Sequence, residues 1–147
     1  MKKLVLGILM AISLFSCSNE SKIKESITNK IKENLKNPDS FEFVSMKISS
    51  KISLDTLKKR VNLKNLNEFK QLIKSDDSDE NKEFLAILQK EYDFTQVYKG
   101  DKNEAAYYVN FVSKGSNGYG AIIQSKYEAQ VLNDDDKTII SVTELDK

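Results

Sequence analysis

The sequence contains no histidine, one cysteine and one proline among its 147 residues. Without histidine, the chain has no histidine general base, no Cys–His pair and no histidine metal ligand. A single cysteine cannot form an intramolecular disulfide, so a folded domain depends on its hydrophobic core alone. The length is sufficient for one such domain and leaves little room for a second.

Charge and hydropathy exclude two further classes of protein. The chain carries 23 basic and 22 acidic residues, and its mean hydropathy is −0.48. A balanced charge gives no overall electrostatic footprint for nucleic acid. The low mean hydropathy excludes a bundle of membrane helices. We therefore expect an ordinary globular domain that binds no nucleic acid.

The N-terminal seventeen residues have the organisation of a bacterial export signal. Lys2 and Lys3 are followed by an uncharged, mostly aliphatic segment from Leu4 to Phe15. This length is typical of a signal peptide and is shorter than the ~20 apolar residues that cross a bilayer. The segment ends in Leu14-Phe15-Ser16-Cys17, which resembles the lipobox of bacterial lipoproteins. A plain secretory signal with an incidental Cys17 is the alternative, although no A-x-A-like cleavage site is present.

The resemblance to the lipobox implies a processed and lipidated protein. Cleavage would follow Ser16, and Cys17 would carry the diacylglyceryl group and acyl chains such as palmitate. Several acyl chains give stable anchoring, since each buried CH₂ contributes ~0.8 kcal/mol. The expected organisation is a signal peptide at 1–16, the lipidated cysteine with a short tether at 17–21, and one domain at 22–147. The location is the cell envelope, and the outer membrane is favoured in a Gram-negative bacterium because Ser18 is not aspartate.

The mature chain begins with an amphipathic pattern. Ile23, Ile27, Ile31 and Leu35 recur at intervals of four, which predicts a helix from about residue 21 to 36. Asn37-Pro38 ends it, because proline disfavours a helical residue before it. The surrounding lysines either face the membrane surface or form a solvated face while the apolar stripe packs on a sheet.

The remaining chain alternates between strand and helix patterns. A strand is predicted at 41–48, two helical stretches with a break near Asn62–Lys64, and a further helix through Phe84, Leu88 and Tyr92. Asp77 and Glu80 have the spacing of a capping box before that helix. Alternating residues at 107–111 and 123–131 and a closing strand at 138–145 predict a C-terminal antiparallel β-meander. The fold class is therefore α+β, with the helices on one face of the sheet.

A second resemblance concerns the junction between the first helix and the first strand. Residues 35–43, Leu-Lys-Asn-Pro-Asp-Ser-Phe-Glu-Phe, are similar to the L-K-[DN]-P-x-S-x-x-F junction of small bacterial envelope proteins of unknown function. The segments Tyr108-Val109-Asn110-Phe111 and Ser116-Asn117-Gly118 are similar to a later strand and turn of those proteins. The resemblance supports the fold and implies no activity.

No motif predicts a cofactor or a metal. The glycine cluster at 115–120 lacks the Gly-Lys-Ser/Thr ending of a phosphate loop, and its position between two strands is typical of a hairpin turn. The acidic segment at 77–81 lacks the glycine and the glutamate of a calcium loop. The aspartates at 134–136 are typical of a solvated turn. No spacing selects a catalytic pair of carboxylates.

Five polar or aromatic residues are the candidate binding face: Tyr108, Asn110, Tyr119, Gln124 and Lys126. Aromatic and amide side chains on the polar side of a sheet or at its rim suit a recognition surface, and they equally suit an ordinary solvated sheet. The leading hypothesis is a non-catalytic envelope lipoprotein that binds a protein or a glycan, for example as an inhibitor or immunity protein. The alternative is a hydrolase that uses carboxylates or an all-oxygen metal site.

Overall fold

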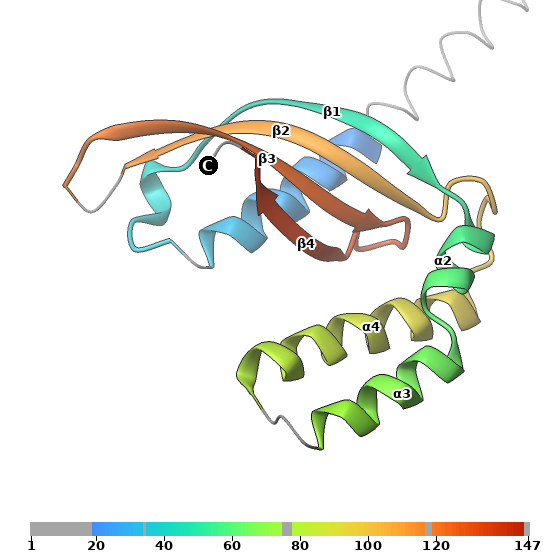
Figure 1. Cartoon of the computed structure of the whole chain (residues 1–147). Helices are drawn as coiled ribbons and strands as arrows, with labels where there is room; N and C mark the ends of the chain where they lie inside the picture. The colour runs from blue at the N-terminus through green and yellow to red at the C-terminus, as the bar shows by residue number, and fades with distance from the viewer. Residues whose placement is uncertain (1–18, 34, 75–77, 117–118, 146–147) are drawn as a thin grey trace, which may run out of the picture.

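The structure is a computed structural model that describes residues 19–33, 35–74, 78–116 and 119–145 (Figure 1). The expected signal peptide, its cleavage site at Ser16 and Cys17, and Ser18 lie outside the described residues. Asp77, one half of the expected capping box, lies outside them too.

Four antiparallel strands form one sheet, in the order β1-β2-β3-β4. They are β1 (Glu42–Ile52), β2 (Ala106–Ser116), β3 (Ile122–Leu132) and β4 (Ile139–Glu144). Because the sheet order follows the chain order, each strand pairs with its neighbour in sequence, and β2, β3 and β4 form the predicted meander. Together with the helices, this sheet confirms the α+β class.

The structure describes the N-terminal helix over residues 19–32 and has no helix at 35–37, so the helix ends before the predicted residue 36 and Leu35 is not part of it. Its apolar side packs on β2 and β3. Ile23 and Ile27 have no exposed surface, and Ile31 is partly buried beside them. They belong to the first core cluster, which we define by its buried members: Ile23, Ile27, Tyr107, Val109, Phe111, Ala129 and Val131. Pro38 then begins the short 3₁₀ helix η1 (Pro38–Ser40), which leads into β1.

Three helices connect β1 to β2: α2 (Leu54–Arg60), α3 (Leu63–Ile73) and α4 (Asp79–Val97). The predicted break near residue 62 coincides with Asn62, whose side chain accepts a hydrogen bond from the Asn65 amide at the start of α3. The expected Asp77–Glu80 capping box is wrong. Ser78 caps α4 instead, because its hydroxyl accepts the Asn81 N–H.

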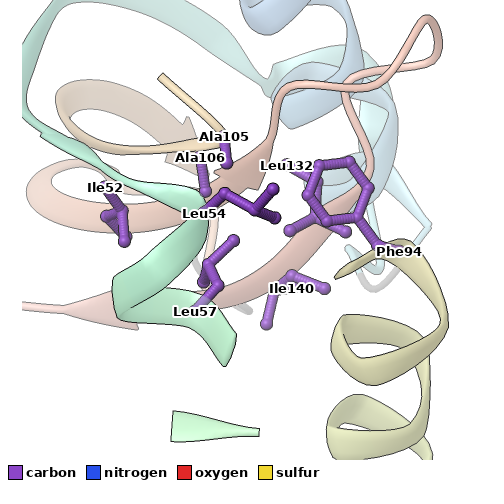
Figure 2. Close-up of a cluster of buried hydrophobic side chains, with 8 residues drawn as sticks. All are labelled: Ile52, Leu54, Leu57, Phe94, Ala105, Ala106, Leu132 and Ile140. Atoms are coloured by element: carbon purple, nitrogen blue, oxygen red, sulfur yellow. The ribbon is translucent and has the colours of Figure 1, made fainter. Parts of the chain in front are cut away.

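A second core cluster lies where α2 and α4 meet the sheet, and Figure 2 shows its side chains converging from both helices and the strands. Its buried members are Ile52, Leu54, Leu57, Phe94, Ala105, Ala106, Leu132 and Ile140. Successive residues of a strand face opposite sides, so Ala106 and Leu132 lie on the other face from Tyr107 and Val131. The helices therefore divide between two faces, unlike the single covered face that the sequence predicted. The alternation of apolar and polar residues did not predict the second covered face, because the strands are apolar on both sides only at their ends.

Candidate functional site

Four of the five residues of the candidate binding face share the face of the sheet opposite the N-terminal helix. The register pairs Tyr108 with Gln130, Asn110 with Glu128, Val112 with Lys126 and Lys114 with Gln124. Directly paired residues point to the same side, so Tyr108, Asn110, Lys126 and Gln124 form one row along β2 and β3. Tyr119 is not in this row; it lies in the turn after β2 and is 98% exposed.

The two ends of this row have different environments. Tyr108 is half-buried, packs against the second core cluster and accepts a hydrogen bond from Arg60 Nη1 at 3.4 Å. Asn110 is exposed and lies between Lys47 of β1 and Glu128 of β3. Around Asn110, the exposed strip of this face therefore presents an amide between a positive and a negative charge, and Tyr108 lies beyond it at the covered end.

A buried polar network links α2, α4 and β3 at that covered end. Glu91 is 3% exposed, and its Oε1 accepts hydrogen bonds from Arg60 Nη2 and from Gln130 Nε2. Arg60 Nη1 also donates to Gln130 Oε1 at 3.2 Å. A guanidinium has the planar, multiple donors that such a bridge needs, which a lysine ammonium lacks. The network therefore holds α2 and α4 against the sheet.

This network was not predicted from the sequence, although the sequence contains one signal of it. Arg60 is the only arginine among the 23 basic residues, all the others being lysine. An isolated arginine in a lysine-rich chain indicates a position that requires the forked geometry. Nothing in the sequence names its partners, because Glu91 and Gln130 are 31 and 70 residues away.

A groove of about 380 Å³ runs beside β4, between the N-terminal helix and α4. Its lining includes Ile31 and Leu35 from the N-terminal side, Ile87 from α4, and residues 139–142 of β4. An adjoining cavity of about 480 Å³ shares Ile87 and Ile140, and it reaches Arg60 and Glu91. The aromatic pair Phe69–Phe84, with ring centroids 4.9 Å apart, lines its outer part.

The acidic turn before β4 is organised around Lys137 and Asp134. Lys137 Nζ donates to Asn133 Oδ1 at 2.7 Å and to the Asp134 carbonyl at 2.9 Å. The Asp134 carboxylate accepts from the amide and the hydroxyl of Thr138, at 2.8 and 2.6 Å. Burial lowers the pKa of Lys137. Asp134 is thus used inside the turn, and within the described ranges no three Asp, Glu, His or Cys side chains form a metal-binding group.

The glycine-rich segment also occupies a turn. Ser116 pairs with Ile122 at the end of the β2–β3 hairpin, and Gly120 has a φ of +81°, which glycine adopts without strain. Asn117 and Gly118 lie outside the described residues. The segment connects two strands, unlike a phosphate-binding loop, which leads from a strand into a helix.

Comparisons with protein-family models, curated proteins and solved structures gave no match to this chain. In the part of the chain that the structure describes, no helix combines the length and apolar character needed to cross a membrane.

Proposed function

We propose that this protein is a lipoprotein of the bacterial cell envelope whose domain is a non-catalytic binding module for a protein or a glycan. The proposed lipid anchor is supported by the motif Leu14-Phe15-Ser16-Cys17, which places the only cysteine of the chain at the lipidation position. The folded domain begins within two residues of Cys17, because Asn19 Nδ2 donates a hydrogen bond to the Tyr107 hydroxyl of β2 at 3.4 Å. Two residues span at most ~7 Å, so a lipid on Cys17 holds this end of the sheet at the bilayer.

This attachment orients the domain. Asn19, Lys51 and Glu104 line one recess together with Tyr107, near the start of β2. The eleven residues of β2 then extend roughly 35 Å to the β2–β3 turn. Figure 1 shows the start of the N-terminal helix (blue) and this turn toward opposite ends of the sheet. The exposed strip around Asn110 lies between the two ends, where a soluble or membrane-bound partner has access to it.

The chemistry of the described residues favours binding over catalysis. Glu91 is the one buried carboxylate among them, and it is already engaged by Arg60 and Gln130. A general base has to be able to reach a substrate proton. The exposed strip instead offers an amide and charges of both signs, which suit the polar part of a recognition surface.

The anchor is tested by metabolic labelling with palmitate in the bacterium. Cys17→Ser should abolish the label, and the chain should accumulate as precursor or be secreted. Ser18→Ala is the matched control and should keep both label and membrane partition. Label retained in the Cys17→Ser variant would exclude lipidation at this residue.

The non-catalytic role is tested with the purified protein on esterase, phosphatase, peptidase and glycosidase substrates, with and without Ca²⁺, Mg²⁺ or Mn²⁺. We expect no turnover. An activity that follows the protein through purification and disappears on substitution of one Asp or Glu would show that the domain is an enzyme.

A further inference from the structure

Strand β4 is one of the two edge strands of the sheet, and some of its backbone hydrogen-bonding groups point away from the sheet. The Leu145 N–H donates to the Lys126 carbonyl of β3 at 2.8 Å. In an antiparallel strand the backbone groups of successive residues alternate between the two sides. The pairing is regular from Ser141 to Glu144. Val142, three residues before Leu145, therefore directs its N–H and C=O to the outer edge.

The groove described above lies along this edge. It contacts residues 139–142 of β4. Ile139 and Val142 pack against the first core cluster and Ile140 belongs to the second, so the groove reaches both faces of the sheet. The N-terminal helix flanks the edge on one side with Ile31, and α4 flanks it on the other side with Ile87.

The flanking helices determine what can pair with this edge. In a second copy of the chain, β4 would lie between the same two helices, so pairing two copies through β4 would bring four helices together at the seam. A single extended peptide brings no helices and needs only the ≈ 4.8 Å that separates neighbouring strands. Extended peptides bind open sheet edges through main-chain hydrogen bonds, with pockets for alternate side chains.

The two walls of the groove carry opposite charges. Lys30, which also pairs with the exposed Glu33 at 3.3 Å, lies on the wall formed by the N-terminal helix, and Glu83 lies on the wall formed by α4. Alternate side chains of an added strand face opposite walls. The charge-complementary peptide therefore has an acidic residue facing the N-terminal helix and a basic residue facing α4. Its other residues are apolar to match Ile31, Leu35 and Ile87.

The other edge of the sheet lacks these properties. Strand β1 is interrupted by two register shifts and carries Lys47 and Lys51. Irregularities and lysines are devices that discourage pairing at an exposed edge. Strand β4 has one register shift, between Ile139 and Ser141, but its pairing is regular beyond it and it contains neither lysine nor proline.

We propose that the groove beside β4 binds an extended segment of a partner protein, which adds to the sheet as a fifth strand and places apolar residues and one charge of each sign between the two helices. The proposal rests on the binding role proposed above and names the class of partner and its site.

The backbone pairing is tested on the full chain in a mild detergent, by fluorescence anisotropy with a synthetic peptide of about ten residues. The peptide carries isoleucine and threonine, with one glutamate and one lysine at positions of opposite parity. Val142→Pro removes the edge N–H, and Val142→Ala is the control that loses similar packing but keeps the donor. We expect binding to Val142→Pro about tenfold weaker than to Val142→Ala. Equal affinities would overturn the proposal.

A second arm leaves the protein unchanged, in case Val142→Pro fails to fold. N-methyl groups on two adjacent central residues of the peptide block both of its hydrogen-bonding edges and retain its side chains. This peptide should bind the wild-type chain at least tenfold more weakly than the unmethylated one. Equal binding would show that the groove recognises side chains without strand addition, and would overturn the proposal.

The charge arm uses Lys30→Glu, which makes both walls acidic. The wild-type chain should prefer the glutamate–lysine peptide over a peptide with lysine at both positions, by about threefold. The variant should reverse this preference. An unchanged preference would overturn the assignment of the two walls.

Failure here and failure of the proposed anchor can be distinguished. If no peptide binds up to about 1 mM while palmitate labelling depends on Cys17, the strand-addition site is wrong and the anchor stands. If the peptides bind as expected in a chain that carries no lipid, the groove stands and the anchor is wrong.

Discussion

The two faces of the sheet are buried by different chemistry. On one face, the N-terminal helix covers the middle of β2 and β3 with an apolar cluster that includes Ile23 and Ile27. On the other face, α2 and α4 cover one end only, and the polar network of Arg60, Glu91 and Gln130 lies at the rim of that cover. The rest of this face, around Asn110, is exposed.

The two faces therefore have different roles. Apolar burial stabilises the folded domain, and the polar network selects one arrangement of its helices. Apolar burial is non-directional, so the first face contributes stability over a broad contact. A charged network is satisfied in few geometries, and breaking it leaves uncompensated groups. We infer that the first face dominates stability, and that the network defines the position of α4 and hence one wall of the groove beside β4.

The largest expected effect breaks the apolar side. Ile27 is fully buried, and Ile27→Asp places a carboxylate in the first core cluster without a partner. The free energy of unfolding should fall by about 4 kcal/mol or more, measured by urea denaturation. Ile122, which is 77% exposed on β3, offers the matched control. Ile122→Asp should change stability by no more than about 0.5 kcal/mol. Similar losses in both variants would mean that the N-terminal helix does not seal this face.

Much of this fold was predictable from the sequence because the signals are local. The interval of four in Ile23, Ile27 and Ile31 predicts a helix, and the alternation in β2 and β3 predicts paired strands. The break at Asn62 was predictable for the same reason. The cap of α4 was assigned to the wrong residue, since Asp77 and Ser78 are both good caps and the choice depends on the backbone around them.

The second-largest effect breaks the polar side. Glu91→Leu removes the carboxylate that Arg60 and Gln130 share, and the side chain of Arg60 is 37% exposed, so solvent recovers part of the loss. We expect a destabilisation of about 2 kcal/mol in urea denaturation. Lys90→Leu, at an exposed neighbouring position of α4, should have little effect.

A double variant sharpens this result. Adding Arg60→Met to Glu91→Leu should recover part of the lost stability, because the guanidinium no longer lacks its partner. Strictly additive losses would show that Arg60 and Glu91 contribute independently, and that the network does not act as a unit.

The candidate site was less predictable than the fold, because its parts meet only through tertiary structure. The row of Tyr108, Asn110, Gln124 and Lys126 follows from alternation and pairing, so the sequence could place those residues together. Tyr119 did not follow, since a turn has no period. Arg60 and Glu91 lie on different helices, and the groove beside β4 depends on how the N-terminal helix and α4 pack against the sheet, which no local pattern encodes.

The smallest expected effect compares the two faces through their tyrosines at alkaline pH. Tyr107 belongs to the first core cluster, and Tyr98 packs against the second. Burial raises the pKa of both tyrosines above the usual 10.0, and the negative charge of Glu104 raises both pKa values further. The unfolded chain therefore releases these protons first. The stability that the neutral phenols contribute is complete below pH 10 and is lost as the pH rises through the folded-state pKa.

Lys137 acts in the opposite direction. Burial lowers its pKa from 10.5, so in the window just below that value the unfolded chain binds more protons, and stability rises with pH. The loss of stability above pH 10 that the tyrosines cause should therefore be clearest in a Lys137→Met background, measured by urea denaturation between about pH 8 and pH 11.5. In that background Tyr107→Phe should flatten the fall more than Tyr98→Phe, because Tyr107 is 2% exposed and Tyr98 is half-buried. The reverse order would mean that the face under α2 and α4 excludes water better than the face under the N-terminal helix, and the contrast between the two faces would be lost.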